Sequence, residues 1–169
     1  MKSRSFGFSI ALAIFALDQL AKWIVSGPLH LQEVAQITIL PIFNLTWTEN
    51  NGISLGLLNA ETAVGRWMLV ALTSAIAIGV AIWIGREKYR WDQAALGMIL
   101  GGALGNILDR ARHGFVVDFA DLHFGTFRPF LVFNVGDAAI SIGVVILLVR
   151  AFLIKDEHKK LPKESVENA

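Results

Sequence analysis

The sequence contains no cysteine and few charged residues. Without cysteine, disulfide bonds, thiol catalysis and thiolate metal sites are all excluded. Only 17% of the 169 residues are charged, whereas 54% are hydrophobic and the mean hydropathy is +0.56. There are too few polar side chains to cover the surface of a water-soluble fold. The net charge of +1 gives no bulk electrostatic signal, and we expect no nucleic-acid partner and no cofactor.

Long apolar segments predict a polytopic membrane protein that is mainly α-helical. A helix needs about 20 apolar residues to cross the bilayer core. We expect four transmembrane helices, at about residues 6–26, 63–85, 93–110 and 134–154. The first has the basic start of a signal peptide, but Asp18 interrupts its apolar run, so we expect it to be retained. Residues 1–154 are then a single membrane-embedded domain, expected to be a monomer, and residues 155–169 a polar, disordered tail.

Lysine and arginine residues set the expected orientation, because they collect on the cytoplasmic side. They precede the first helix, follow the fourth, and occur between the second and third as Arg86, Lys88 and Arg90. Residues 26–62 contain none. Both termini are therefore expected in the cytoplasm, and the two longer loops outside.

The two outer loops carry the patterns of short β-strands and a short helix. Phe43, Leu45 and Trp47 alternate with polar residues, and residues 50–52 suit a turn, so we expect a hairpin over residues 43–58. Residues 115–119 alternate in the same way, and residues 28–36 fit a short interfacial helix. These pieces predict a small extracytoplasmic β platform for an extended peptide, with tryptophan at the membrane interface.

The third apolar segment carries glycines four residues apart. Gly97, Gly101 and Gly105 share one helix face, where small residues let another helix approach closely. Helix packing explains the glycines, but it does not explain Asn106 and Asp109 on the same segment.

Four aspartates fall near the outer ends of the apolar segments, at one expected depth. They are Asp18, Asp109, Asp118 and Asp137. An ionisable group inside a bilayer helix costs at least about 2.5–3.5 kcal/mol, so such residues indicate function by default.

Structural roles remain open for three of these aspartates. Asp109 fits an ion pair with Arg110, and Asp18 fits a bond to Lys22 one helical turn away, or to the backbone of a neighbouring helix. Asp137, three residues after an asparagine, fits a capping box. Asp118 has no comparable structural explanation.

Two carboxylates at one site share a proton and titrate as a pair. The ionised one takes a proton from water and the protonated one polarises a carbonyl, as in aspartic proteases. Three alternatives remain open. A serine–lysine peptidase would need a serine beside Lys22. A metalloprotease would use His113, His123, Asp118 and Asp121, whose spacing is no recognised ligand pattern, so we expect no metal. A proton-carrying transporter would be expected to contain an inverted repeat, which the sequence lacks.

Two longer motifs resemble a known family. "GGALGNILDRARHGFVVDF" (101–119) and "FNVGDAAI" (133–140) closely resemble the paired motifs of lipoprotein signal peptidase, the type II signal peptidase of bacteria. "ALDQLAKW" (16–23) and "TENNGISLGLL" (48–58) also resemble it, in the right order. The match extends from about residue 10 to 150.

The resemblance implies an aspartyl protease of the bacterial cytoplasmic (inner) membrane, with its active site near the outer face. Such an enzyme cleaves the signal peptide from diacylglyceryl-modified prolipoproteins, just before the lipidated cysteine. The implied partners are this lipid-modified substrate, membrane lipids and the inhibitor globomycin.

The resemblance also assigns roles to residues. It implies that Asp118 and Asp137 are catalytic. The implied substrate- or inhibitor-binding residues are Asn50, Asn106, Arg110 and Asn134, and the implied structural residues are Asp18, Gly105 and Asp109. The chain departs from the family at Gly136, where many members have alanine, and at residues 52–56, which puts loop packing and inhibitor contacts in doubt.

Overall fold

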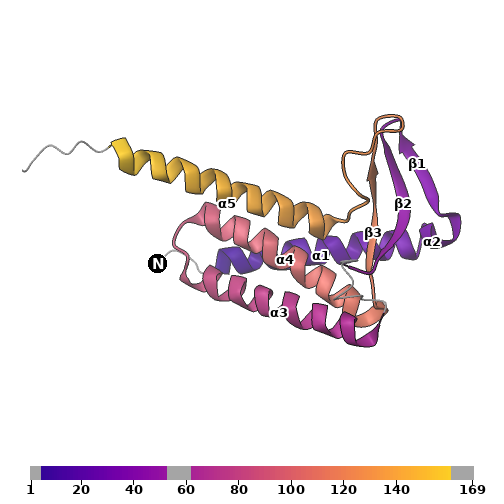
Figure 1. Ribbon diagram of the computed structural model, residues 1–169, viewed down its shortest axis with the longest axis horizontal. Helices are drawn as coiled ribbons and strands as arrows, with labels where there is room; N and C mark the ends of the chain where they lie inside the picture. The colour runs from indigo at the N-terminus through magenta and orange to yellow at the C-terminus, as the bar shows by residue number, and fades with distance from the viewer. Residues whose placement is uncertain (1–4, 53–61, 161–169) are drawn as a thin grey trace, which may run out of the picture.

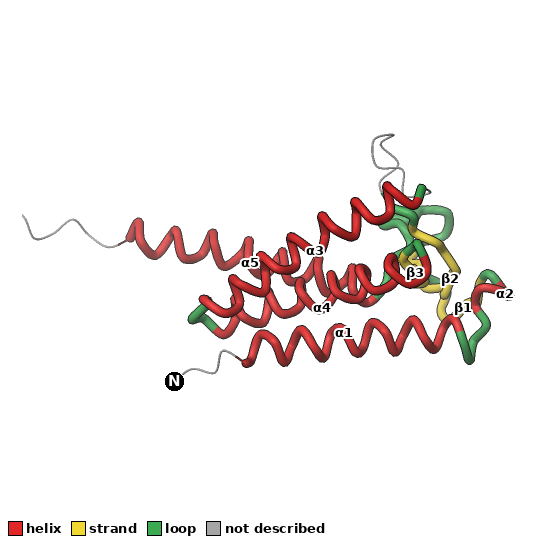
Figure 2. Tube along the Cα trace, turned by 90° about the horizontal axis from the view of Figure 1, so that it is seen from below, coloured by secondary structure: helices red, strands yellow, loops and turns green. Residues whose placement is uncertain are grey.

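The chain forms a bundle of long helices with a small sheet across one end. The computed structural model describes residues 5–52 and 62–160, with side chains up to residue 152. Its long helices run side by side (Figures 1 and 2); they are α1 (Ser5–Ser26), α3 (Ala63–Arg86), α4 (Arg90–His113) and α5 (Val135–Lys160). Their bounds lie close to the predicted ones, except that α5 continues through residues 155–160, where a disordered tail was expected. The helical backbone corrects that part of the prediction.

Three of these helices meet the length and hydropathy of a membrane span within the described residues. They are α1, α3 and the part of α5 from Val135 to Phe152. The fourth helix, α4, is less apolar because it lies against protein: it packs on α1, α3 and α5. Its buried residues include Gln93, Asn106 and Asp109, which neighbouring helices cover.

The glycines of α4 allow the close helix approach that their spacing predicts. Gly97 and Gly101 lie against the backbone carbonyls of Gly7 and Ala11 on α1. Gly102 lies in the same way against Gly136 of α5. A side chain at any of these α4 positions would overlap the neighbouring backbone, so the glycines set the spacing of the bundle that carries the site.

A three-stranded antiparallel sheet crosses the end of the bundle (Figure 1), in the order β1 (Gln36–Leu40), β2 (Phe43–Asn50), β3 (Val116–Leu122). The first strand of the expected hairpin is present as β2, and β2 also pairs with the preceding strand β1, which the sequence analysis did not predict. The predicted turn at residues 50–52 does end β2, and the return strand expected after it falls mostly on residues 53–61, outside the described part. The short helix α2 (Leu31–Val34) precedes β1, within the predicted range.

An apolar cluster holds the sheet against the bundle. Its buried members are Val25, Leu31, Val117, Phe119 and Ala120. Trp47 is half-buried and packs on this cluster, so its ring contributes to the core of the sheet.

An irregularity in β3 brings the start of α5 next to the sheet. The backbone N–H groups of Phe119 and Ala120 both donate to the carbonyl of Phe133, at 3.2 and 2.7 Å. Two successive donors on one carbonyl are typical of a β-bulge. The contact places Asn134, the residue after Phe133, beside Asp118.

Candidate active site

Asp118 is buried on β3, at the end of the bundle. Its side chain is 1% exposed. Its Oδ1 accepts a hydrogen bond of 2.6 Å from Asn134 Nδ2, and its Oδ2 accepts one of 3.0 Å from Asn50 Nδ2. A carboxyl group removed from water therefore keeps both oxygens hydrogen-bonded, but only to neutral amides.

Asp137 lies in the first turn of α5 and forms the predicted capping box. Asn134 Oδ1 accepts from the backbone N–H of Asp137 at 2.9 Å, and Asp137 Oδ2 accepts from the backbone N–H of Asn134 at 3.3 Å. The box leaves Asp137 Oδ1 available, and this atom accepts from Asn106 Nδ2 at 2.8 Å. Unlike Asp118, Asp137 is half-buried and borders an apolar groove of about 370 Å³.

Asparagine amides connect the two aspartates. Asn134 donates from its backbone to Asp137 and from its side chain to Asp118. The same Nδ2 also donates to Asn106 Oδ1 at 3.1 Å, while Asn106 Nδ2 donates to Asp137. The structure thus joins residues 19 positions apart in sequence, from a strand and a helix, in one hydrogen-bonded group.

The surroundings of Asp118 change its acidity. Burial, followed by the negative charge of Asp137, raises the pKa of Asp118 from 3.8 to about 6. The amides of Asn50 and Asn134 and the charge of Lys22 act in the opposite direction and limit the rise. A raised pKa beside a second carboxylate is expected of a pair that shares one proton.

The other two aspartates hold the backbone next to this pair. Asp18 Oδ1 accepts from the backbone N–H of Gly136 at 2.9 Å, and Asp109 Oδ2 accepts from that of Val117 at 3.1 Å. Asp18 therefore fixes the residue immediately before Asp137, and Asp109 fixes the residue immediately before Asp118. Gly105 faces the Asp18 carboxylate and leaves no room for a side chain. The supporting role expected of these residues agrees with these contacts.

Lys22 joins the two supporting aspartates. Its side chain is almost fully buried, and Nζ lies 2.8 Å from Asp18 Oδ2 and 2.9 Å from Asp109 Oδ2. Nζ also donates to Asn106 Oδ1 at 3.1 Å. Asp109 thus pairs with Lys22, which corrects the expected pair with Arg110, while both structural alternatives for Asp18 are confirmed. Sequence reasoning missed the central place of Lys22; the available signal was a lysine one turn after an aspartate in an apolar helix.

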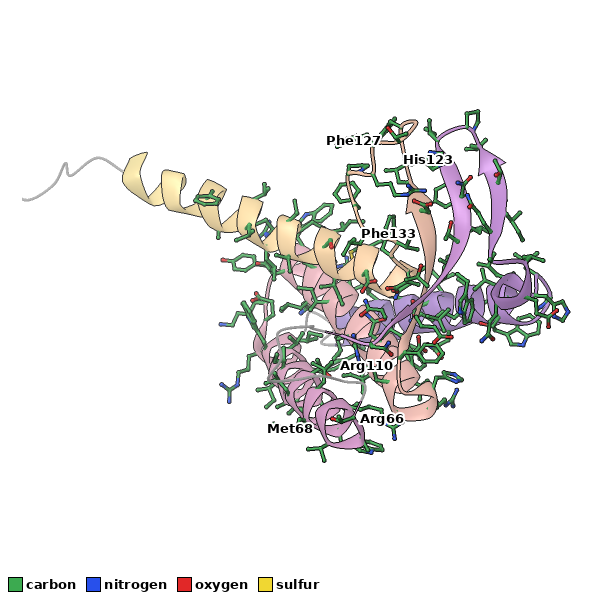
Figure 3. The ribbon with its side chains drawn as sticks, turned by 45° about the vertical axis from the view of Figure 1, so that its right-hand side comes forward. Arg66, Met68, Arg110, His123, Phe127 and Phe133 are labelled. Atoms are coloured by element: carbon green, nitrogen blue, oxygen red, sulfur yellow. The ribbon has the colours of Figure 1, made fainter. Side chains whose placement is uncertain are left out.

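Arg110 lies on α4 near both aspartates of the pair, within electrostatic reach of each. Figure 3 places Arg110 and Phe133 where the helices meet the sheet. In the described part of the chain, Arg110 Nε is buried without a hydrogen-bond partner. Every residue that the sequence analysis assigned to the site therefore lies in or beside this cluster.

A carboxyl pair held by amides at the end of apolar helices, with one member buried and one bordering a groove, is an arrangement expected of a membrane-embedded aspartic peptidase. A family model described as signal peptidase (SPase) II matches residues 10–153. The chain belongs to the signal peptidase II family.

Individual relatives agree with this assignment. The chain is 51% identical over 164 residues to a lipoprotein signal peptidase of Rhizorhabdus wittichii, covering 97% of this chain and 94% of the relative. It is 54% identical over 152 residues to one of Sphingopyxis alaskensis, covering 90% and 88%. It is also similar to a solved bacterial membrane enzyme, with a TM-score of 0.73 and 26% identity over 95% of this chain and 94% of that one.

Proposed function

We propose that Asp118 and Asp137 are the catalytic dyad of this peptidase. As a signal peptidase II, the chain is an aspartic peptidase that cleaves signal peptides from prolipoproteins. The observation that carries the assignment is the bridge of Asn134, which donates to both carboxylates. No other pair of aspartates in the described residues combines such a bridge with an open groove on one side.

The difference in burial supports different roles for the two carboxyl groups. Asp118 is buried and its pKa is raised to about 6, so we assign it the shared proton and the role of general acid. Asp137 borders the groove and acts as the general base. It takes a proton from water as the oxygen attacks the scissile carbonyl, while Asp118 protonates the carbonyl oxygen. Collapse of the resulting gem-diol returns one hydroxyl proton to Asp118 and breaks the C–N bond, while the proton on Asp137 passes to the leaving amine.

The amides and the arginine position the substrate. Among the residues that the structure describes, Arg110 Nε is a buried donor without a partner, and a substrate carbonyl would satisfy it. Asn50 and Asn106 each hold one oxygen of one aspartate, which fixes the orientation of both carboxyl groups. The substrate we propose is the diacylglyceryl-modified prolipoprotein, cut just before its lipidated cysteine. Globomycin would compete for the same place.

The membrane arrangement follows from charge and packing. We take α4 as a fourth span, because α1, α3 and α5 cover its polar residues. The α3–α4 connection carries Arg86, Lys88 and Arg90, which favours the cytoplasm. The sheet and the start of α5 lie at the opposite end of the bundle (Figure 1), and they carry Asp118 and Asp137. This end corresponds to the outer face of the bacterial inner membrane.

Two isosteric substitutions test the dyad. Asp118→Asn and Asp137→Asn should each reduce cleavage of a purified lipidated prolipoprotein by at least about 100-fold, since each removes an acid–base group. The matched control Glu33→Gln, on the exposed helix α2, should cleave normally and remain sensitive to globomycin. Normal cleavage by either aspartate variant, with insertion unchanged, would refute the assignment.

A further inference from the structure

An apolar surface outside the active site occupies the far end of the sheet. The β1–β2 turn and the segment after β3 lie together there, because His123 N donates to the Ile42 carbonyl at 3.0 Å. Large apolar side chains cover this end and are exposed. We call it the apolar tip; its members are Leu40, Ile42, Phe124, Phe127, Phe130 and Leu131. Leu131 is 91% exposed and Phe127 63%.

The tip has a fixed shape. Arg128 Nε lies 3.1 Å from Asp121 Oδ1, and the Asp121 side chain is 2% exposed. Thr46 Oγ1 donates to Asp121 Oδ2 at 3.2 Å. Phe124 and Phe127 are joined by two backbone hydrogen bonds of 2.8 and 3.2 Å. The ordered backbone holds the aromatic side chains outward, although folding inward would remove them from water.

The tip is continuous with the side of a membrane-spanning helix. The groove at Asp137 is lined by Phe130 and Phe133 together with Ala138 and Ile142 of α5. Ile142 belongs to the apolar span of α5 and is itself 51% exposed. Figure 1 shows the sheet crosswise to the helices, with the segment after β3 on the side toward α5. Figure 3 shows Phe127 and His123 at the end of the sheet remote from Arg66 and Met68 of α3.

We infer that the apolar tip is immersed in the outer leaflet of the bilayer beside α5. Three observations select lipid as the occupant: continuity with the exposed apolar surface of the α5 span, exposed Phe and Leu side chains of the kind that enter the boundary between headgroups and acyl chains, and a half-exposed arginine among them. The Arg128 side chain is 53% exposed and uses Nε and Nη2 on Asp121. Its remaining terminal nitrogen would then contact lipid phosphates.

Immersion would give the groove a lateral opening toward lipid. The tip then forms the lipid-side rim of the groove, next to Asp137. A membrane-bound substrate would reach the groove without leaving the bilayer. The inference concerns a surface, and it holds whichever residues carry out the chemistry.

The absence of cysteine allows a direct depth measurement. Single cysteines carrying a nitroxide label would be placed at the tip as Phe127→Cys and Leu131→Cys, in the full chain with Asp118→Asn. Lys88→Cys, exposed in the α3–α4 connection, is the aqueous control, and Val145→Cys, exposed on the α5 span, is the lipid control. The protein is reconstituted in phosphatidylcholine vesicles with and without phosphatidylglycerol. Collision with oxygen and with a water-soluble nickel chelate is then compared.

Both tip labels should resemble Val145, with oxygen collisions exceeding those of the nickel chelate. A nickel-chelate collision rate at either tip position equal to that at Lys88 would overturn the inference and leave the tip to a protein partner or to water. A second measurement uses Phe127→Ser with Leu131→Ser in the active chain. Cleavage should fall at least about fivefold in vesicles and less than about twofold in detergent micelles. Equal effects in the two environments would also contradict the inference.

Discussion

Replacing Asp118 by asparagine should abolish activity and stabilise the protein at neutral pH. The pKa of Asp118 is raised to about 6 in the folded chain, mainly by burial. A carboxyl with a raised folded pKa contributes stability that is complete below its unfolded pKa and is lost as pH rises through the folded pKa. The ionised group therefore costs stability above pH 6. The pKa of Asp118 rises from 3.8 to about 6. At about 1.4 kcal/mol for each pKa unit, the ionised carboxylate costs the folded protein about 3 kcal/mol.

Asparagine removes this charge but accepts only one of the two amide donors. Asn50 and Asn134 both donate to Asp118, so one hydrogen bond is lost, at a cost of about 1 kcal/mol. Asp118→Asn should then be more stable than the parent chain by about 2 kcal/mol at pH 7.5. This advantage should fall below about 1 kcal/mol at pH 5, where the parent carboxyl is mostly protonated.

The assay is reversible unfolding in mixed micelles of a mild and a denaturing detergent, followed through the fluorescence of the five tryptophans, between pH 5 and pH 8. Glu33→Gln is the control. The difference between its free energy of unfolding and that of the parent chain should not change with pH, because Glu33 lies on the surface. An Asp118→Asn variant no more stable at pH 7.5 than the parent would refute the reasoning, and so would a stability difference independent of pH.

Two further substitutions test the support of the dyad, with the same unfolding assay and a cleavage assay. Lys22→Met leaves Asp18 and Asp109 buried without their cation, so the free energy of unfolding should fall by about 3–5 kcal/mol; a loss under about 1 kcal/mol would show that Lys22 is not the central charge. Gly105→Ala directs a methyl group into the Asp18 carboxylate, which should displace it from Gly136 and reduce cleavage at least about tenfold. Gly79→Ala, with open space around it on α3, should leave cleavage unchanged, and equal activities of the two variants would contradict this account.

The helices could be predicted from the sequence because their signal is local. Apolar length places α1, α3 and α5, and the glycine spacing places the face of α4 that meets α1. The capping box at Asn134 and Asp137 is likewise local, since both residues lie within one turn. For such features, neighbouring residues contain the whole physical cause.

The sheet and the centre of the site could not be predicted in the same way. The pairing of β2 with β3 joins residues about 70 positions apart, such as Thr48 with Asp118, and no local pattern specifies that register. The place of Lys22 depends on Asp109, which meets it only when α1 and α4 pack. Sequence reasoning identified the aspartates by type and depth, whereas their individual partners follow from helix packing.

The division of charge around the dyad explains why the site uses asparagines. Neither Lys22 nor Arg110 bridges Asp118 and Asp137. Lys22 is bonded instead to Asp18, Asp109 and Asn106. Arg110 Nε makes no hydrogen bond within the described structure. A cation bridging the pair would favour ionisation of both groups and remove the shared proton that acid–base chemistry needs. Amides satisfy the carboxylate oxygens without adding charge. Asn50, Asn106 and Asn134 therefore fix the geometry of Asp118 and Asp137 while burial keeps a proton available.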